Sequence, residues 1–160
     1  MNPILRPAIE VDIADLKPLL KDLYRGDLGP RFSDVLDEYL RSESHHVILA
    51  AADGRAVGVL IGSYRLDIDH ECRAGLIDAI VVAPNLRGRG IGKKLLGAFA
   101  QWARGRGCTV LQVVNGNREF FERLSFTQRR VMFHQASLDE ATITDPHVGC
   151  GPESIDESPH

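Results

Sequence analysis

The sequence lacks the features that mark several classes of protein. No run approaches the roughly 20 apolar residues that a membrane-spanning helix requires, and the polar start lacks the charged and then apolar pattern of a signal peptide. The three cysteines show no paired spacing, so neither a zinc site nor a disulfide framework is expected. These absences favour a cytoplasmic protein with reduced thiols, no bound metal and no membrane association.

The sequence also has little excess charge. Its formal net charge is -3 and its pI is near 6.1, so no general attraction to nucleic acid is expected. With 160 residues, 44% hydrophobic and 26% charged, the chain is long enough for one globular domain with an apolar core. We expect this domain to span residues 1–136 and the polar segment 137–160 to form a flexible C-terminal tail.

The first part of the sequence predicts two helices. Apolar residues recur at helical spacing from 13 to 23, where Asp12 or Asp15 would be the N-cap. A second helical pattern runs from 33 to 40, with Ser33 as the expected N-cap. Two short helices are therefore expected before the main sheet.

The middle of the sequence predicts a hairpin and a buried strand. Runs rich in β-branched residues at 46–51 and 56–66 flank Asp53-Gly54, a hairpin signal whose connection has two residues or more. Residues 76–82 are almost continuously apolar, as in a strand that is buried on both faces and lies inside the sheet. Pro84 cannot extend the hydrogen-bonded ladder and should end this strand.

A strand–helix–strand unit follows from the next pattern. Apolar residues recur at helical spacing from 92 until Gly105, and residues 110–114 then predict a short buried strand. Such a crossover implies parallel strands and a right-handed connection. Two further elements are expected, a short helix at 118–124 and one or two closing strands at 126–135.

A glycine-rich loop joins the buried strand to the helix at 92. Its residues, Arg87-Gly88-Arg89-Gly90-Ile91-Gly92, offer backbone N–H groups at the positive end of a helix dipole, which favours a phosphate. A tight strand-to-helix turn with a solvated basic first turn is the alternative. The nucleoside-triphosphate loop requires Ser or Thr after Gly-Lys, but Lys93-Lys94 follow Gly92. The dinucleotide fingerprint requires Gly-x-Gly-x-x-Gly, and the spacing here is one residue too short.

This spacing resembles the signature of the GNAT superfamily of N-acetyltransferases, which places Arg or Gln, two residues, Gly, one residue and then Gly or Ala at a strand-to-helix junction. The segments 82–88 and 120–126 also resemble blocks of that family, and the resemblance covers residues 4–135. It implies an α/β (α+β) fold: a mixed, mostly antiparallel central sheet with a splayed parallel strand pair, flanked by about four helices.

The resemblance implies acetyl-CoA as co-substrate and an amine as acceptor. Backbone groups of Ile80 and Val82 would hydrogen-bond the pantetheine arm, with Val81 lining its channel. The pyrophosphate would lie on the loop from Arg87 through Gly88, Arg89, Gly90, Ile91 and Gly92 to Lys93. Asn115 or Asn117 stands where a family asparagine touches the arm, although an N-cap role for the helix at 118 is equally compatible with the sequence.

The resemblance also implies direct attack of the amine on the thioester in a ternary complex. Asp78 occupies the strand position where many relatives carry a glutamate that deprotonates the amine through water; a structural ion pair or solvation is the alternative. A backbone N–H near Val82 is the expected donor to the oxyanion. Phe121 stands where tyrosine commonly protonates the departing thiolate, so Tyr24, Tyr64 or water would replace it.

Two other functions compete with this one. A non-catalytic acyl-CoA sensor or regulatory module would keep the loop and lose the acid, and Phe121 is its support. Nucleic-acid binding through the basic loop is weaker, because the chain is acidic overall and no aromatic residues interleave the basic run. The sequence leaves the acceptor open among small amines, aminoglycoside-like polyamines, amino acids and protein amino groups, and it leaves a homodimer open as well.

Overall fold

The computed structural model describes residues 2–24, 26–113 and 117–127. In chain order their elements, with η for a 3-10 helix, are β1 (Ile4–Pro7), η1 (Glu10–Asp12), α1 (Ile13–Tyr24), α2 (Phe32–Arg41), β2 (His45–Ala52), β3 (Arg55–Asp67), β4 (Cys72–Val82), η2 (Pro84–Leu86), α3 (Ile91–Gly105), β5 (Cys108–Val113) and α4 (Arg118–Arg123). All of them lie in one compact unit, Met1–Ser125. The predicted tail at 137–160, and the closing strands at 126–135 beyond residue 127, lie outside the described residues, so the predicted domain boundary stays a prediction.

The five strands that the structure describes form one sheet in the order β1-β2-β3-β4-β5. The pairs from β1 to β4 are antiparallel, and β4 pairs with β5 in parallel. The chain crosses from β4 to β5 through α3, as a parallel pair requires. The predicted mixed, mostly antiparallel sheet with one parallel pair is thereby confirmed.

A two-residue turn joins β2 to β3. Ala52 and Arg55 face each other across the hairpin, and φ is 51° at Asp53 and 73° at Gly54. Positive φ at both central residues is what a type I′ turn requires, and Asp-Gly is among the sequences that adopt it with least strain. The predicted hairpin is confirmed, with the shorter of the two expected connections.

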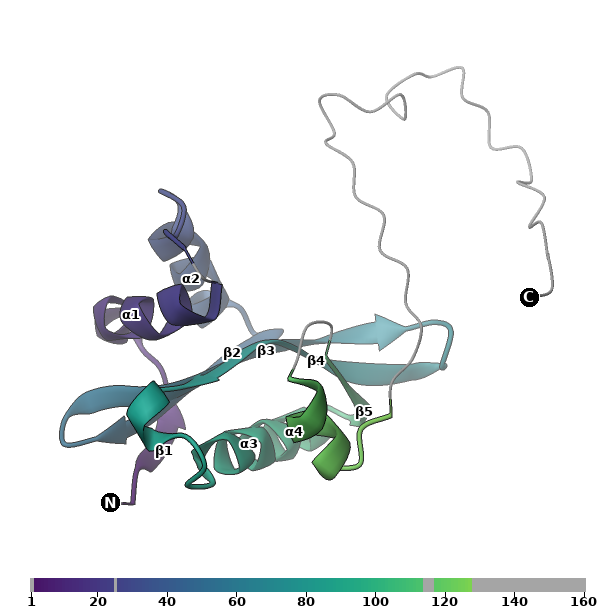
Figure 1. The fold of residues 1–160 in the computed structure, drawn as a ribbon. Coiled ribbons are helices and arrows are strands. Elements are labelled where there is room, and N and C mark those ends of the chain that lie inside the picture. The colour runs from purple at the N-terminus through teal and green to yellow at the C-terminus, as the bar shows by residue number, and fades with distance from the viewer. Residues whose placement is uncertain (1, 25, 114–116, 128–160) are drawn as a thin grey trace. The chain divides into compact units, whose positions relative to one another are not determined.

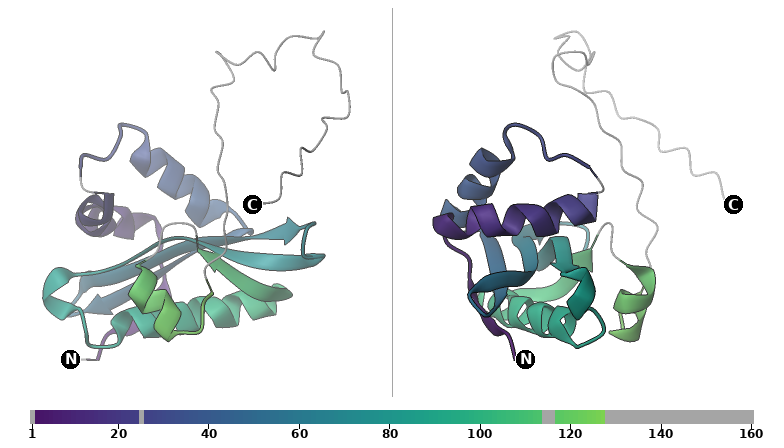
Figure 2. Two further views of the ribbon diagram at one scale, coloured as in Figure 1. Left: turned by 45° about the vertical axis from the view of Figure 1, so that its right-hand side comes forward. Right: turned by 60° about the vertical axis from the view of Figure 1, so that its left-hand side comes forward.

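Helices cover both faces of the sheet. α1 and α2 lie on one face, and α3 lies on the other (Figure 1; Figure 2). On the first face Leu16 and Leu20 of α1 are buried in a cluster with Val59 of β3. On the second face the fully buried Phe99 lies over Gly62, where a Cβ atom would stand 2.5 Å from the Phe99 Cζ. The glycine therefore lets α3 approach β3 closely, and the sheet has an apolar layer on each side.

The starts of both N-terminal helices differ from the prediction. Asp15 lies inside the first turn of α1, and the Asp12 carboxylate points back, where it accepts the Ile9 N–H at 2.8 Å and two Arg6 N–H groups at 2.7 Å each. Chiefly through Arg6, these bonds lower the pKa of Asp12. Because α1 begins directly after η1, Pro18 lies inside the helix.

The prediction that Ser33 caps the second helix is wrong. α2 begins at Phe32, and Arg31 precedes it without a side-chain hydrogen bond to the helix end. The physical reason is the preceding turn, in which the Phe32 N–H donates to the Gly29 carbonyl at 3.1 Å. The chain therefore already coils before Ser33, and no hydroxyl cap is needed there.

The prediction that residues 110–114 are a buried strand is also wrong in part. β5 forms, but the side chain of Val110 is 40% exposed. β5 lies at one end of the strand order that the structure describes, and α3 covers only one of its faces. The apolar run therefore reflects β-propensity as much as burial.

Candidate active site

The loop that carries the glycines lies between β4 and α3. Gly88 has a φ of 76° and Gly90 a φ of 80°, values that glycine adopts without strain. Gly90 directly precedes α3, and the first helical hydrogen bond runs from the Lys94 N–H to the Gly90 carbonyl at 3.1 Å. The N–H groups of residues 91–93 therefore point out of the helix end, where the helix dipole favours an anion.

The Arg87 side chain turns away from this helix end. Its Nε donates to the Val82 carbonyl at 3.0 Å, and its Nη2 donates to the Asp22 Oδ2 at 2.7 Å. The guanidinium thus ties the loop to the end of β4 and to α1. The side chain of Arg87 thus holds the surrounding elements together, and a contact of its backbone with the pyrophosphate stays a prediction.

The other basic side chains near the loop are exposed. Lys94 Nζ donates to the Asn2 Oδ1 at 2.8 Å, whereas Arg89 and Lys93 extend from the loop and the first turn of α3. Positive charge beside the helix end therefore comes chiefly from Arg89 and Lys93. The predicted Ile91 is 4% exposed, so a ligand on the loop would meet its backbone rather than its side chain.

The backbone of β4 faces two different neighbours. The Ala83 N–H donates to the Val57 carbonyl of β3 at 2.8 Å, and residues of an antiparallel pair alternate between bonded and non-bonded positions. In the register of β3 and β4, Val81 is therefore bonded to β3, whereas Ile80 and Val82 direct their N–H and C=O groups to the other side. These are the two residues that the sequence predicts for the pantetheine arm.

β5 runs beside only part of β4. The last parallel pair joins Ile77 and Val113, and residues 114–116 lie outside the described part of the chain. Pairing in the described residues thus stops before Ile80 and Val82, where the splay is predicted. The Val82 carbonyl already accepts from Arg87 Nε, so the groups that an extended ligand could bond, as a short additional strand, are the Ile80 N–H and C=O and the Val82 N–H.

A β-bulge interrupts β4 at Asp78. Ile61 of β3 faces Ala79, and the next residue, Gly62, faces Ile77, so Asp78 is the extra residue. A bulge of this kind alters which way the following side chains point, because one residue is added to a repeat of two.

The two halves of β4 accordingly present opposite faces. Before the bulge, a Cβ atom on Gly75 would meet Phe99 and Ala103 of α3. After the bulge, Ala79 and Val81 belong to the buried cluster beneath α1 and α2. Val81 is thus a core residue by its side chain, and its predicted place along the cofactor channel stays a prediction.

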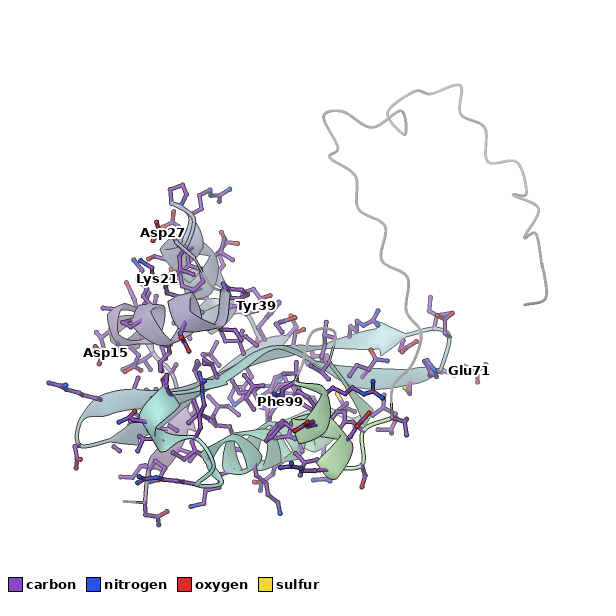
Figure 3. All side chains as sticks on the ribbon, viewed as in Figure 1. Asp15, Lys21, Asp27, Tyr39, Glu71 and Phe99 are labelled. Carbon is purple, nitrogen blue, oxygen red and sulfur yellow. The ribbon has the colours of Figure 1, made fainter. Side chains whose placement is uncertain are left out.

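Four polar side chains from four elements meet on the α1 and α2 side of the bulge, and we call them the Asp78 cluster. They are Tyr24 at the end of α1, Tyr39 in α2, His45 at the start of β2 and Asp78 itself. Tyr39 Oη donates to Asp78 Oδ2 at 3.3 Å, and the ring centroids of Tyr39 and His45 are 4.1 Å apart. Figure 3 shows Tyr39 between α2 and the sheet.

The surroundings of Asp78 make it a stronger base than an ordinary aspartate. Although the residue is accessible to solvent, burial of its carboxyl group raises its pKa, while the Tyr39 hydrogen bond and the charge of His45 act in the opposite direction. Burial and the Asp78 charge raise the pKa of both Tyr24 and Tyr39, so both hydroxyls stay protonated at neutral pH. One base beside two neutral donors can accept a proton from an amine.

Sequence reasoning missed Tyr39. In the sequence it falls at an apolar position of the helical pattern at 33–40, where it predicts a core residue rather than a partner of Asp78. The signal that could have found it is the hydroxyl on an otherwise apolar face, because a buried tyrosine hydroxyl usually has a partner.

The two tyrosines expected to replace the missing acid lie on opposite faces of the sheet. Phe121 is buried, with its ring edge-on to Phe120 at 5.0 Å between centroids. Tyr64 lies on the α3 side, 5.9 Å from the Trp102 ring, whereas Tyr24 lies in the Asp78 cluster. Of the two tyrosines that the sequence proposed as the acid, Tyr24 therefore shares a face with the predicted base and Tyr64 does not.

Asn117 caps α4. Its Oδ1 accepts the Phe120 N–H at 3.0 Å, so the N-cap role that the sequence left open is confirmed. Asn115 lies outside the described residues. A contact of either asparagine with the cofactor arm stays a prediction.

Within residues 2–24, 26–113 and 117–127, no group of three or more His, Cys, Asp or Glu side chains is arranged to hold a metal ion. In the same residues, each helix is too short or too polar to cross a membrane. The buried side-chain nitrogen and oxygen atoms described by the structure all have hydrogen-bond partners.

Comparison with known proteins gives a family and two kinds of named relative. A sequence model described as the acetyltransferase (GNAT) family matches residues 13–126. An aminoglycoside N(6')-acetyltransferase type 1 of Klebsiella aerogenes is 30% identical over 115 residues, which cover 68% of this chain and 75% of that protein. A glucosamine 6-phosphate N-acetyltransferase 1 of Oryza sativa subsp. japonica is 28% identical over 138 residues, which cover 72% of this chain and 82% of that protein.

Solved structures share the fold. AAC(6')-Iy, in complex with the bisubstrate analog CoA-S-monomethyl-acetylneamine, matches with a TM-score of 0.76 at 23% identity, over 86% of this chain and 99% of that one. The predicted fold class is confirmed by this likeness together with the observed sheet.

Proposed function

Because the chain belongs to the acetyltransferase (GNAT) family, we propose that it transfers an acetyl group from acetyl-CoA to an amine acceptor by direct attack in a ternary complex. The observation that carries this proposal is the arrangement around β4. The end of the strand leads into a loop with anion-binding geometry, and its bulge places a carboxylate of raised pKa in the same strand. The proposed donor site and the proposed base would thereby lie on one element.

The donor side fits acetyl-CoA through backbone groups. We assign the pyrophosphate to the N–H groups of the loop from Arg87 to Lys93, with Arg89 and Lys93 adding positive charge. The pantetheine arm would lie along the backbone of Ile80 and Val82. Acetyl-CoA supplies the thioester whose carbonyl carbon the amine attacks.

On the acceptor side, Asp78 removes the proton that would otherwise block the amine. The carboxylate takes it directly or through one water molecule, so that the nitrogen lone pair can form the new C–N bond. A backbone N–H near Val82 stabilises the carbonyl oxygen as it gains charge. The nitrogen is cationic once the C–N bond has formed, and it loses its extra proton to solvent. The C–S bond then breaks, the thiolate leaves with the electron pair, and Tyr24 or solvent protonates it.

The relatives suggest where to search for the acceptor. Both curated relatives carry the names of enzymes that acetylate amines of sugars or aminoglycosides. We therefore propose an amino sugar as the first acceptor class to test, followed by amino acids and peptide N-termini. Their names also favour an enzyme over the non-catalytic acyl-CoA module that Phe121 suggests.

The test measures thiol release from acetyl-CoA in the presence of each amine. Steady release that depends on one acceptor, with the acetylated amine identified by mass spectrometry, supports the proposal. Calorimetry provides the second measurement, and saturable binding of acetyl-CoA is expected. Absence of that binding would contradict the donor assignment, and binding without turnover on any amine would favour the acyl-CoA module.

A further inference from the structure

The role of Tyr39 follows from where α2 places its hydroxyl. The Tyr39 side chain leaves α2 toward the sheet (Figure 3), and its Oη donates to Asp78 Oδ2 at 3.3 Å. The hydrogen bond spans 39 positions of sequence and joins α2 to β4. It therefore fixes the carboxylate relative to the helical layer rather than within its own strand.

Asp78 needs such a contact because it is the bulged residue of β4. The register shift leaves it without a directly opposite residue on β3, and a bulged residue lacks the regular cross-strand neighbours that orient other strand side chains. An aspartate side chain has rotational freedom at two bonds. A donor from outside the strand can select one orientation.

Tyr39 is itself held in place. Its ring packs against the His45 ring at 4.1 Å with an interplanar angle of 57°. The His45 Nδ1 lies 2.8 Å from the Ser42 Oγ and 3.1 Å from the Ser44 Oγ. The phenol is thus supported from β2. Among the residues that the structure describes, the titratable groups that face Asp78 are Tyr24 from α1, Tyr39 from α2 and His45 from β2.

We propose that Tyr39 is a positioning residue for acetyl transfer: its hydroxyl orients the Asp78 carboxylate toward the acceptor amine and stabilises the charged form that accepts the proton. This inference rests on the proposed function, in which Asp78 is the base. Tyr39 acts through Asp78 and need not touch the acceptor. The contribution of its hydrogen bond to the Asp78 pKa has the sign that this role requires, since it opposes the effect of burial.

The test begins with a direct titration of Asp78 in the full-length protein without added ligand. Carbon-13 NMR of labelled aspartate carboxyls follows Asp78 in wild type and in Tyr39→Phe, which keeps the ring against His45 and removes only the hydroxyl. Loss of a donor to the carboxylate should raise the Asp78 pKa by about half to one pH unit. The matched control is Tyr64→Phe on the opposite face of the sheet, which should leave the Asp78 pKa unchanged. Equal titration of Asp78 in wild type and Tyr39→Phe would overturn the proposal.

Kinetics then separate this inference from the proposed function. With an aminoglycoside that carries a free 6'-amine as the probe, Tyr39→Phe should move the acid limb of kcat/KM upward by the same interval and lower kcat more than it changes KM. An unmoved acid limb, despite a shifted carboxyl titration, also overturns the positioning role. If Asp78→Asn has unchanged kinetics, Asp78 is not the base, and the role proposed for Tyr39 is contradicted as well. If Asp78→Asn strongly lowers activity but Tyr39→Phe does not change it, only the role proposed for Tyr39 is contradicted.

Discussion

The proposed donor and acceptor sides of β4 differ in the parts of the polypeptide that they would use. On the donor side the candidate contacts are backbone groups: the N–H groups at the start of α3, and the Ile80 groups and Val82 N–H that point away from β3. On the acceptor side they are the side chains of the Asp78 cluster, which come from α1, α2, β2 and β4. A backbone site tolerates many side chains provided that glycine supplies the required conformation, whereas a side-chain site depends on each residue and on the packing that assembles it.

The largest expected effect is on the acceptor side. Asp78→Asn keeps the size of the side chain and removes the base, so kcat/KM for the amine should fall by roughly 100-fold to 10,000-fold. The rate profile should also shift to higher pH, because the variant depends on amine that has already lost its proton. Stopped assays across a pH series with acetyl-CoA measure both effects. Unchanged kinetics would show that the acceptor side does not act through Asp78.

The same variant should not lose stability. Because the Asp78 pKa is raised in the folded protein, its charged form opposes folding, and stability declines as pH rises from the unfolded-state pKa through the folded one. Asparagine carries no charge to bury. The melting temperature of Asp78→Asn at neutral pH should therefore equal or exceed that of wild type, and a marked decrease would assign the carboxylate a structural role.

On the donor side, acetyl-CoA binding should be lost when the backbone conformation of the loop is changed. Gly90→Glu places a side chain at a φ of 80° and a negative charge at the helix end, and we expect the dissociation constant for acetyl-CoA to rise by roughly 100-fold. Gly97→Glu is the matched control, since it adds the same group to α3 where a Cβ atom meets nothing within 4 Å. Calorimetry should show near-normal binding for the control. Equal affinities for both variants would contradict the loop assignment.

A smaller effect on acetyl-CoA affinity is expected from substitution of Arg87. Its size tests whether the Arg87 side chain contacts the donor directly. If the guanidinium ties the loop to β4 and α1, Arg87→Gln should weaken acetyl-CoA binding by only about fivefold. Asp22→Asn should reproduce part of that loss, because it removes the 2.7 Å ion pair. A loss of roughly 100-fold for Arg87→Gln, with no effect of Asp22→Asn, would instead place the guanidinium on the pyrophosphate.

The smallest expected effect concerns Asn117. Asn117→Ala should lower the free energy of unfolding by about 1 kcal/mol, because it leaves the Phe120 N–H without its cap, whereas Asn117→Ser should retain most of the stability. Denaturant titration measures the difference. Measuring acetyl-CoA affinity then tests whether Asn117 also contacts the cofactor. Weaker binding in Asn117→Ser, at unchanged stability, would indicate that the Asn117 side chain touches the donor.

Much of the fold could be predicted from local patterns. The Asp53-Gly54 hairpin, the helix at 91–105 and the parallel pair follow from turn chemistry and spacing, which act over a few residues. The errors have local causes as well. The cap at Ser33 is wrong because a turn at residues 29–32 already starts the coil, and the burial of Val110 is wrong because β-propensity does not reveal the position of a strand in the sheet.

The donor site could be predicted for the same reason, and most of the acceptor site could not. Gly88 and Gly90 indicate a backbone with positive φ at their own positions in the sequence. Tyr39 and Asp78 meet only because α2 packs over β4, and nothing near either residue indicates the other. The bulge at Asp78 could not be placed from the sequence, because Gly62 in β3 and Gly75 in β4 are compatible with a bulge at several positions of the pair.

The bulge at Asp78 also gives β4 one residue more than its pairing with β3 requires. Ala79 lies opposite Ile61 and Ile77 lies opposite Gly62, so a codon deletion of Asp78 would join two residues that already belong to opposite faces, and the strand would alternate regularly. Ala79 and Val81 would keep their present face, and the proposed base alone would be lost. Evolution can therefore add or remove the proposed acceptor side of β4 by the insertion or deletion of a single codon, without turning the part of the strand proposed to bind the donor.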